Sequence, residues 1–117
     1  MRFFRKERMG SVIQRELSML INREIEFRDG ALVTITDVQV GDDLENAKVK
    51  ISALPAEKAE GALKILTKFQ PRLQGMLLRI MNVRPMPRIF FELDKGLDNA
   101  AEVEKSLLKD NNKETAV

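Results

Sequence analysis

Apolar residues recur at steps of three and four between residues 9 and 26, which predicts an amphipathic helix. The first turn of this pattern contains Gly10, and glycine is unfavourable inside a helix. We therefore expect the helix to begin just after Gly10, with Ser11 as its N-terminal cap. The apolar stripe consists of Met9, Ile13, Leu17, Leu20, Ile21 and Ile25.

The two segments that follow alternate between apolar and polar positions, as β-strands do. In the first, residues 32–40, the apolar positions shift from odd to even numbers, and a β-bulge near Thr36 or Asp37 would produce this shift. The second, residues 47–54, alternates without interruption. A short turn that begins at Gly41 joins the two segments, which predicts an antiparallel hairpin. We expect the inward-facing residues of the second strand to be Val49, Ile51 and Ala53.

The next apolar stripe has helical spacing, stops near Phe69 and restarts after Pro71. Proline inside a helix costs about 3 kcal/mol or more, whereas in the first turn of a helix its missing N–H is harmless. The sequence therefore predicts two short helices that meet at a kink made of Phe69, Gln70 and Pro71. A third strand is expected over residues 88–93, with one face formed by Ile89, Phe91 and Leu93.

A length of 117 residues, with 44% hydrophobic and 32% charged residues, is typical of one globular domain. We assign this domain to residues 1–108, because Asn99 and Glu102 form a capping-box pattern for a last helix. Residues 109–117 are polar and are expected to form a flexible tail. No apolar run approaches the roughly 20 residues that a membrane-spanning helix needs. The absence of cysteine predicts a cytoplasmic location, and a mostly charged surface predicts a monomer. We also expect no contact with a membrane.

The chain contains neither histidine nor cysteine. Histidine is the commonest general base and metal ligand, and cysteine supplies thiolate nucleophiles. Asp37, Asp42 and Asp43 could hold a metal ion, but the spacing of a calcium loop is absent. Asp42 and Asp43 fit turn chemistry better, and Asp37, beside the change of parity, fits a structural role. We therefore expect no catalysis, no metal, no cofactor and no small-molecule substrate.

Acidic and basic residues are separated along the chain. Residues 29–47 contain five acids and no base, whereas residues 64–91 contain six bases and no acid. A solvated helix surface usually mixes the two signs, because oppositely charged residues four positions apart attract each other. We therefore interpret the six bases as contacts to RNA phosphates, with Arg72 and Arg79 as the first candidates. The full set is Lys64, Lys68, Arg72, Arg79, Arg84 and Arg88.

A second group of bases lies at the start of the sequence, and two interpretations of it remain open. The group is either a mobile basic arm that reaches a nucleic acid or an ordinary disordered segment. Its members are Arg2, Arg5, Lys6 and Arg8.

The predicted order, helix–strand–strand–helix–helix–strand, matches the type II KH topology, in which helices cover one face of a three-stranded sheet. The chain also resembles the ribosome-binding factor A family, whose members are bacterial small-subunit assembly factors. The resemblance lies in Arg15-Glu16-Leu17, in VTITDVQV followed by GDDLENAKVKIS, and in PRIFFELD at the third strand. It extends from about Arg8 to Leu108 and implies a single KH-like α+β domain.

RNA-binding KH domains clamp the RNA backbone with a GXXG loop between the two central helices. This chain has no GXXG motif, and the family it resembles has an interhelical kink there, typically Ala-x-Gly. The kink falls on Phe69, Gln70 and Pro71, so neither the alanine nor the glycine is present. The position where the family often has arginine corresponds to Gln74, and Arg72 is expected to supply that charge.

The resemblance implies a non-catalytic protein that binds the immature small ribosomal subunit and its rRNA through the helix–kink–helix face. Such a protein would assist rRNA processing and maturation and would leave before translation. Two alternatives remain open. One is a general KH-like single-stranded RNA-binding protein, and the other is a protein-interaction module that uses the exposed sheet face around Phe90.

Overall fold

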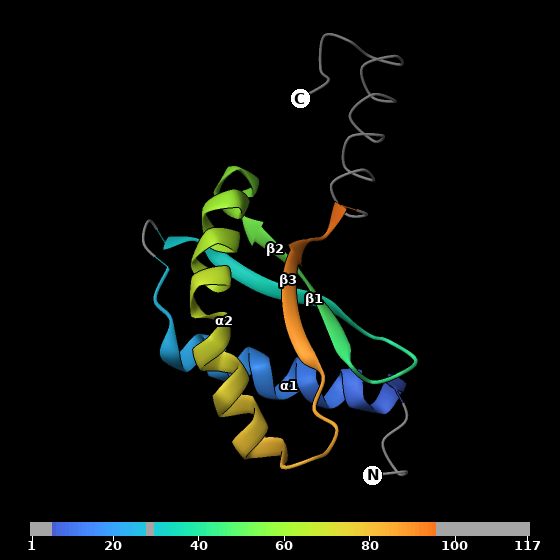
Figure 1. Ribbon diagram of the computed structural model, residues 1–117. Coiled ribbons are helices and arrows are strands. Elements are labelled where there is room, and N and C mark those ends of the chain that lie inside the picture. The colour runs from blue at the N-terminus through green and yellow to red at the C-terminus, as the bar shows by residue number, and fades with distance from the viewer. Residues whose placement is uncertain (1–5, 28–29, 96–117) are drawn as a thin grey trace, which may run out of the picture.

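The computed structural model describes residues 6–27 and 30–95 and has an α+β fold (Figure 1). Its elements are α1 (Lys6–Glu24), β1 (Leu32–Val40), β2 (Asn46–Leu54), a short 3₁₀ helix (Ala56–Lys58), α2 (Ala59–Met81) and β3 (Arg88–Leu93). The predicted fold class is therefore confirmed. None of the helices in these two ranges is long and apolar enough to cross a membrane. The last helix expected after Asn99 lies outside the described residues.

The three strands form one sheet in the order β1-β2-β3. β1 pairs with β2 in the antiparallel sense, and β2 pairs with β3 in the parallel sense. The register of β1 skips one residue between Ile35 and Asp37, so the predicted β-bulge lies at Thr36. The Thr36 hydroxyl donates a hydrogen bond of 2.6 Å to Asp94 Oδ2, which links the bulge to the end of β3.

Both helices cover the same face of the sheet. α1 packs on β1, α2 packs on β3 and β2, and the two helices contact each other. Their buried side chains form one core with the inward residues of the strands, which include the predicted Val49 and Ile51. The alternate strand positions point to the other side, which no described helix covers. We call that side the outer sheet face.

α1 begins at Lys6, so the prediction that it begins after Gly10 was wrong. Gly10 is buried against β1, and a Cβ added to it would lie 2.9 Å from the carbonyl oxygen of Val38. Ser11 is inside the helix, where its hydroxyl donates to the carbonyl oxygen of Glu7 at 3.2 Å. Glycine is tolerated at this position because α1 and β1 approach each other more closely there than a side chain would allow.

α2 runs without interruption from Ala59 to Met81 and contains Pro71 in its interior, so the predicted division into two helices was wrong. Figure 1 shows that the helix axis changes direction between its two halves. Proline removes one backbone hydrogen bond and presses on the preceding turn, which bends a helix. Leu66 and Leu77, on either side of the bend, are fully buried in the same core, and their burial offsets this cost.

Candidate RNA-binding surface

Four of the predicted phosphate contacts lie on α2 and share one side of it. At about 100° per residue, their spacing of four, four and seven residues places them within an arc of about 80°. All four side chains are exposed. We call this set the basic face, and it comprises Lys64, Lys68, Arg72 and Arg79.

An acid from α1 reaches the middle of the basic face. Arg72 Nη2 lies 3.0 Å from Glu24 Oε1, and Arg23 Nε lies 2.9 Å from the other oxygen of the same carboxylate. Residues 64–91 contain no acid, but the fold brings Glu24 of α1 against them. The charge of Arg72 is therefore partly neutralised. Among the described residues, the other three members of the basic face make no ion pair.

The remaining two predicted contacts do not belong to the basic face. Arg84 is exposed in the connection between α2 and β3. Arg88 begins β3 on the outer sheet face, where its guanidinium carbon lies 5.4 Å from the centre of the Phe90 ring. This distance is within the range of a cation–π interaction. The six bases that were predicted together therefore occupy three separate places.

Two glycines lie within the arc of the basic face. A Cβ added to Gly61 or Gly75 would meet no atom within 4 Å, so packing does not require glycine at either position. Glycine in a helix interior costs roughly 0.5–1 kcal/mol relative to alanine. Gly75 leaves the helix surface between Arg72 and Arg79 without a side chain, and Gly61 does the same about one turn before Lys64, which suits a surface that another backbone approaches closely. The sequence interpretation overlooked them, although a glycine inside a segment with helical spacing was a visible signal.

Two glutamine side chains join the bent part of α2 to the start of β3. Gln74 Nε2 donates to the carbonyl oxygen of Pro87 at 2.9 Å, and Gln74 Oε1 accepts from the backbone N–H of Ile89 at 2.8 Å. Gln70 Nε2 donates to the carbonyl oxygen of Ile89 at 3.0 Å. Gln74, at the position where the family often has arginine, therefore holds a strand and adds nothing to the basic face.

Lys6 and Arg8 lie in the first turn of α1, so these two members of the predicted basic arm are helical, whereas Arg2 and Arg5 lie outside the described residues. Lys6 Nζ lies 2.6 Å from Asp42 Oδ1 in the turn between β1 and β2. The hydrogen bond and charge of Asp42 raise the pKa of Lys6, and Lys6 in turn lowers the pKa of Asp42. This pair fastens the start of α1 to the hairpin.

The other two aspartates that were considered as metal ligands serve the backbone. Asp43 Oδ1 accepts from the N–H of Glu45 at 3.0 Å, and Asp37 Oδ1 accepts from the N–H of Val38 at 2.9 Å. These are turn and strand contacts, as their positions in the sequence indicated. In the part of the chain that the structure describes, no group of three or more candidate ligands is placed to hold a metal ion.

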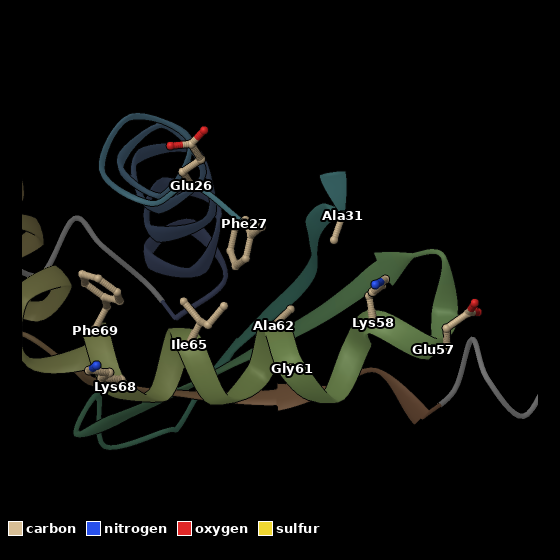
Figure 2. Close-up of a pocket in the computed structure, with 10 residues that line it drawn as sticks. All are labelled: Glu26, Phe27, Ala31, Glu57, Lys58, Gly61, Ala62, Ile65, Lys68 and Phe69. Atoms are coloured by element: carbon tan, nitrogen blue, oxygen red, sulfur yellow. The ribbon is translucent and has the colours of Figure 1, made fainter. Parts of the chain in front are cut away.

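A cleft of about 580 Å³ lies between the N-terminal half of α2 and the segment that joins α1 to β1. Figure 2 shows Phe27 pointing into this cleft toward Ile65, with Phe69 of the predicted kink at one end. Because its lining is mostly apolar, the cleft does not suit phosphate groups. The charged residues along it are Glu26, Glu57, Lys58 and Lys68.

The family profile described as Ribosome-binding factor A matches residues 5–107. The chain belongs to the ribosome-binding factor A family. Ribosome-binding factor A of Coprothermobacter proteolyticus is 33% identical over 117 residues, which cover 100% of this chain and 85% of the relative. That of Ectopseudomonas mendocina is 38% identical over 105 residues, which cover 86% of this chain and 81% of the relative.

Solved structures of ribosome-binding factor A share the fold of this family member. The crystal structure of the Thermus thermophilus protein has a TM-score of 0.67 and 28% identity, and the match covers 77% of this chain and 97% of that one. A homology model of the Thermus thermophilus protein, fitted into a cryo-EM map of a 30S complex, has a TM-score of 0.62 and 28% identity. That match covers 74% of this chain and 91% of the other. The resemblance inferred from the hairpin and third strand is therefore confirmed.

Proposed function

We propose that this protein is a non-catalytic assembly factor that binds the immature small ribosomal subunit and its rRNA through the basic face. It assists rRNA processing and maturation. The observation that carries the proposal is the alignment of Lys64, Lys68 and Arg79 on one side of α2. Membership of the ribosome-binding factor A family supports it, as does the similar Thermus protein that was fitted into a 30S complex.

The basic face offers phosphates both charge and access. Lys64, Lys68 and Arg79 are exposed and have no acidic partner within the described ranges, so their charges are available to a polyanion. Gly75 leaves room for a sugar–phosphate backbone between Arg72 and Arg79. Exposed ion pairs contribute only about 0–1 kcal/mol, so a phosphate could displace Glu24 from the remaining arginine of this face.

Co-sedimentation with isolated small subunits, large subunits and joined ribosomes tests the proposal. The protein should pellet with small subunits alone, and less of it should pellet as salt rises, because phosphate contacts release counterions. Equal pelleting with all three particles would indicate a general RNA-binding protein. Failure to pellet with any of them would contradict the proposal.

Two variants with the same loss of charge localise the contact. Lys68→Ala combined with Arg79→Ala removes two unpaired bases from the basic face and should reduce the log–log salt slope by roughly 1.4, about 0.7 for each contact. Arg15→Ala combined with Lys95→Ala removes the same charge from exposed positions elsewhere and should leave the slope unchanged. Equal losses in both variants would mean that only net charge matters, and the basic face would then have no special role.

A further inference from the structure

The outer sheet face has an aromatic side chain where its neighbours are polar. Phe90 is 45% exposed. It is the Cα partner of Lys48 on β2, which is in turn the partner of Gln39 on β1, so these three residues form one row across the sheet. The exposed ring therefore lies on an open face, in line with a cation and a side-chain amide.

Phe90 and its neighbours border a recess of about 540 Å³ on this face. Lys48 Nζ lies 3.9 Å from Glu92 Oε2, and Arg88 stacks near the ring at 5.4 Å. Gly41 lines the recess without a side chain to fill it. The principal lining residues are Gln39, Gly41, Asn46, Lys48, Phe90 and Glu92.

We propose that this recess holds one unpaired nucleotide of RNA, with its base stacked on Phe90. Aromatic rings stack on bases of any sequence. The amides of Gln39 and Asn46 offer donors and acceptors of the kind that base edges carry. Lys48 and Arg88 provide positive charge for the flanking phosphates. The inference rests on the proposed function and adds a second contact, on the opposite side of the sheet from the core.

The edge of β3 connects this recess to the basic face. Arg88 and Phe90 also border a smaller hollow of about 220 Å³, whose other wall includes Thr67 and Gln70 of α2. Thr67 is adjacent in sequence to Lys68 of the basic face. One RNA strand could therefore contact α2, pass over the edge of β3 and place a base on the outer sheet face.

RNA fits this recess better than a protein partner does. Protein interfaces are built around apolar and aromatic cores from which charged residues are depleted. Here a single ring is surrounded by amides and by charges of both signs, with Lys48 and Arg88 directly beside it. That combination matches a base and its phosphates. An apolar side chain of a protein partner would instead remove water from these charged and polar groups without offering them hydrogen bonds, which is unfavourable.

Tryptophan fluorescence tests the stacking directly, because the chain contains no tryptophan and no tyrosine. Phe90→Trp places a single fluorophore in the recess, and deproteinised small-subunit rRNA should quench it as the base stacks. Met19→Trp, at a position of α1 that is 56% exposed, is the matched control and should not be quenched. Quenching of Phe90→Trp by intact subunits but not by deproteinised rRNA would indicate a ribosomal protein in the recess and would overturn the proposal.

Affinity and salt dependence then separate stacking from charge. Phe90→Ala should weaken binding to small subunits and to their rRNA by about tenfold, while the salt slope stays the same, because stacking releases no counterions. Phe90→Tyr, which keeps a ring, should bind almost as well as the original chain. Thermal unfolding checks that each variant is folded. Unchanged affinity in a folded Phe90→Ala variant would overturn this inference alone, whereas failure of the original chain to bind small subunits would instead remove the proposed function.

Discussion

α1 contains one interior glycine and α2 contains two, and Gly10 of α1 and Gly75 of α2 have opposite surroundings. Gly10 lies in α1 against β1, where an added Cβ would be 2.9 Å from a backbone oxygen. Gly75 lies in α2 on the basic face, where an added Cβ would meet nothing within 4 Å. The first glycine is explained by a contact inside the fold. Among the described residues, no contact explains the second glycine, so packing does not require glycine at that position.

The largest effect is expected when Gly10 is replaced. Gly10→Val forces carbon atoms into the backbone of β1, and overpacking of this kind destabilises a fold by about 3 kcal/mol. Chemical denaturation of the variant and the original chain gives the difference in free energy of unfolding. A variant as stable as the original would show that α1 can move away from the strand at no cost, and the explanation of Gly10 would fail.

The matched change on the other helix should have the opposite sign. Gly75→Ala should raise the free energy of unfolding by roughly 0.5–1 kcal/mol, because alanine favours the helix and the added methyl group has room. The same variant should bind small subunits more weakly, since the methyl group stands between the bases that contact phosphate. Denaturation and co-sedimentation measure the two quantities separately. A more stable variant with unchanged binding would remove Gly75 from the interface.

A smaller effect is expected where the two helices meet. Glu24→Gln removes the acid that pairs with Arg72 and keeps the size of the side chain. Arg72 would then bind a phosphate without first losing Glu24, so binding to small subunits should tighten. Adding Arg72→Ala to this variant should abolish the gain. Unchanged affinity in Glu24→Gln would mean that Arg72 does not contact phosphate.

The smallest effect concerns the ion pair that fastens the start of α1. The pKa of Asp42 is lowered from 3.8, so its contribution to stability is present above that value and disappears as the pH falls through the lower folded-state pKa. The pKa of Lys6 is raised from 10.5, so its contribution is present below 10.5 and disappears as the pH rises through the higher folded-state pKa.

Asp42→Asn should therefore lower the melting temperature slightly near neutral pH. The difference from the original chain should vanish in strongly acidic buffer, where both chains lack the charge. High salt should also reduce it, because the pair is exposed and screened. A difference that persists in acid would mean that Asp42 acts through the turn and not through its charge.

Local patterns in the sequence determined much of the fold. The change of parity in residues 32–40 located the β-bulge, because side chains in a strand alternate between faces and an extra residue must reverse them. The helical stripe that begins at Met9 identified the buried apolar residues of α1, and the sequence of the hairpin and third strand identified the family. The four bases of α2 share one side only because the helix continues through Pro71, which the sequence analysis did not predict.

Other features depended on contacts between residues far apart in the chain, and only the tertiary structure decided them. Gly10 was misread as a helix boundary because the contact that requires glycine there is with β1. Pro71 was misread as a break because the core on both sides of it holds one bent helix together. Glu24 and Arg72 are separated by 48 positions, so no local count of charges could pair them. Periodicity reports which way a side chain points, whereas packing decides what it meets there.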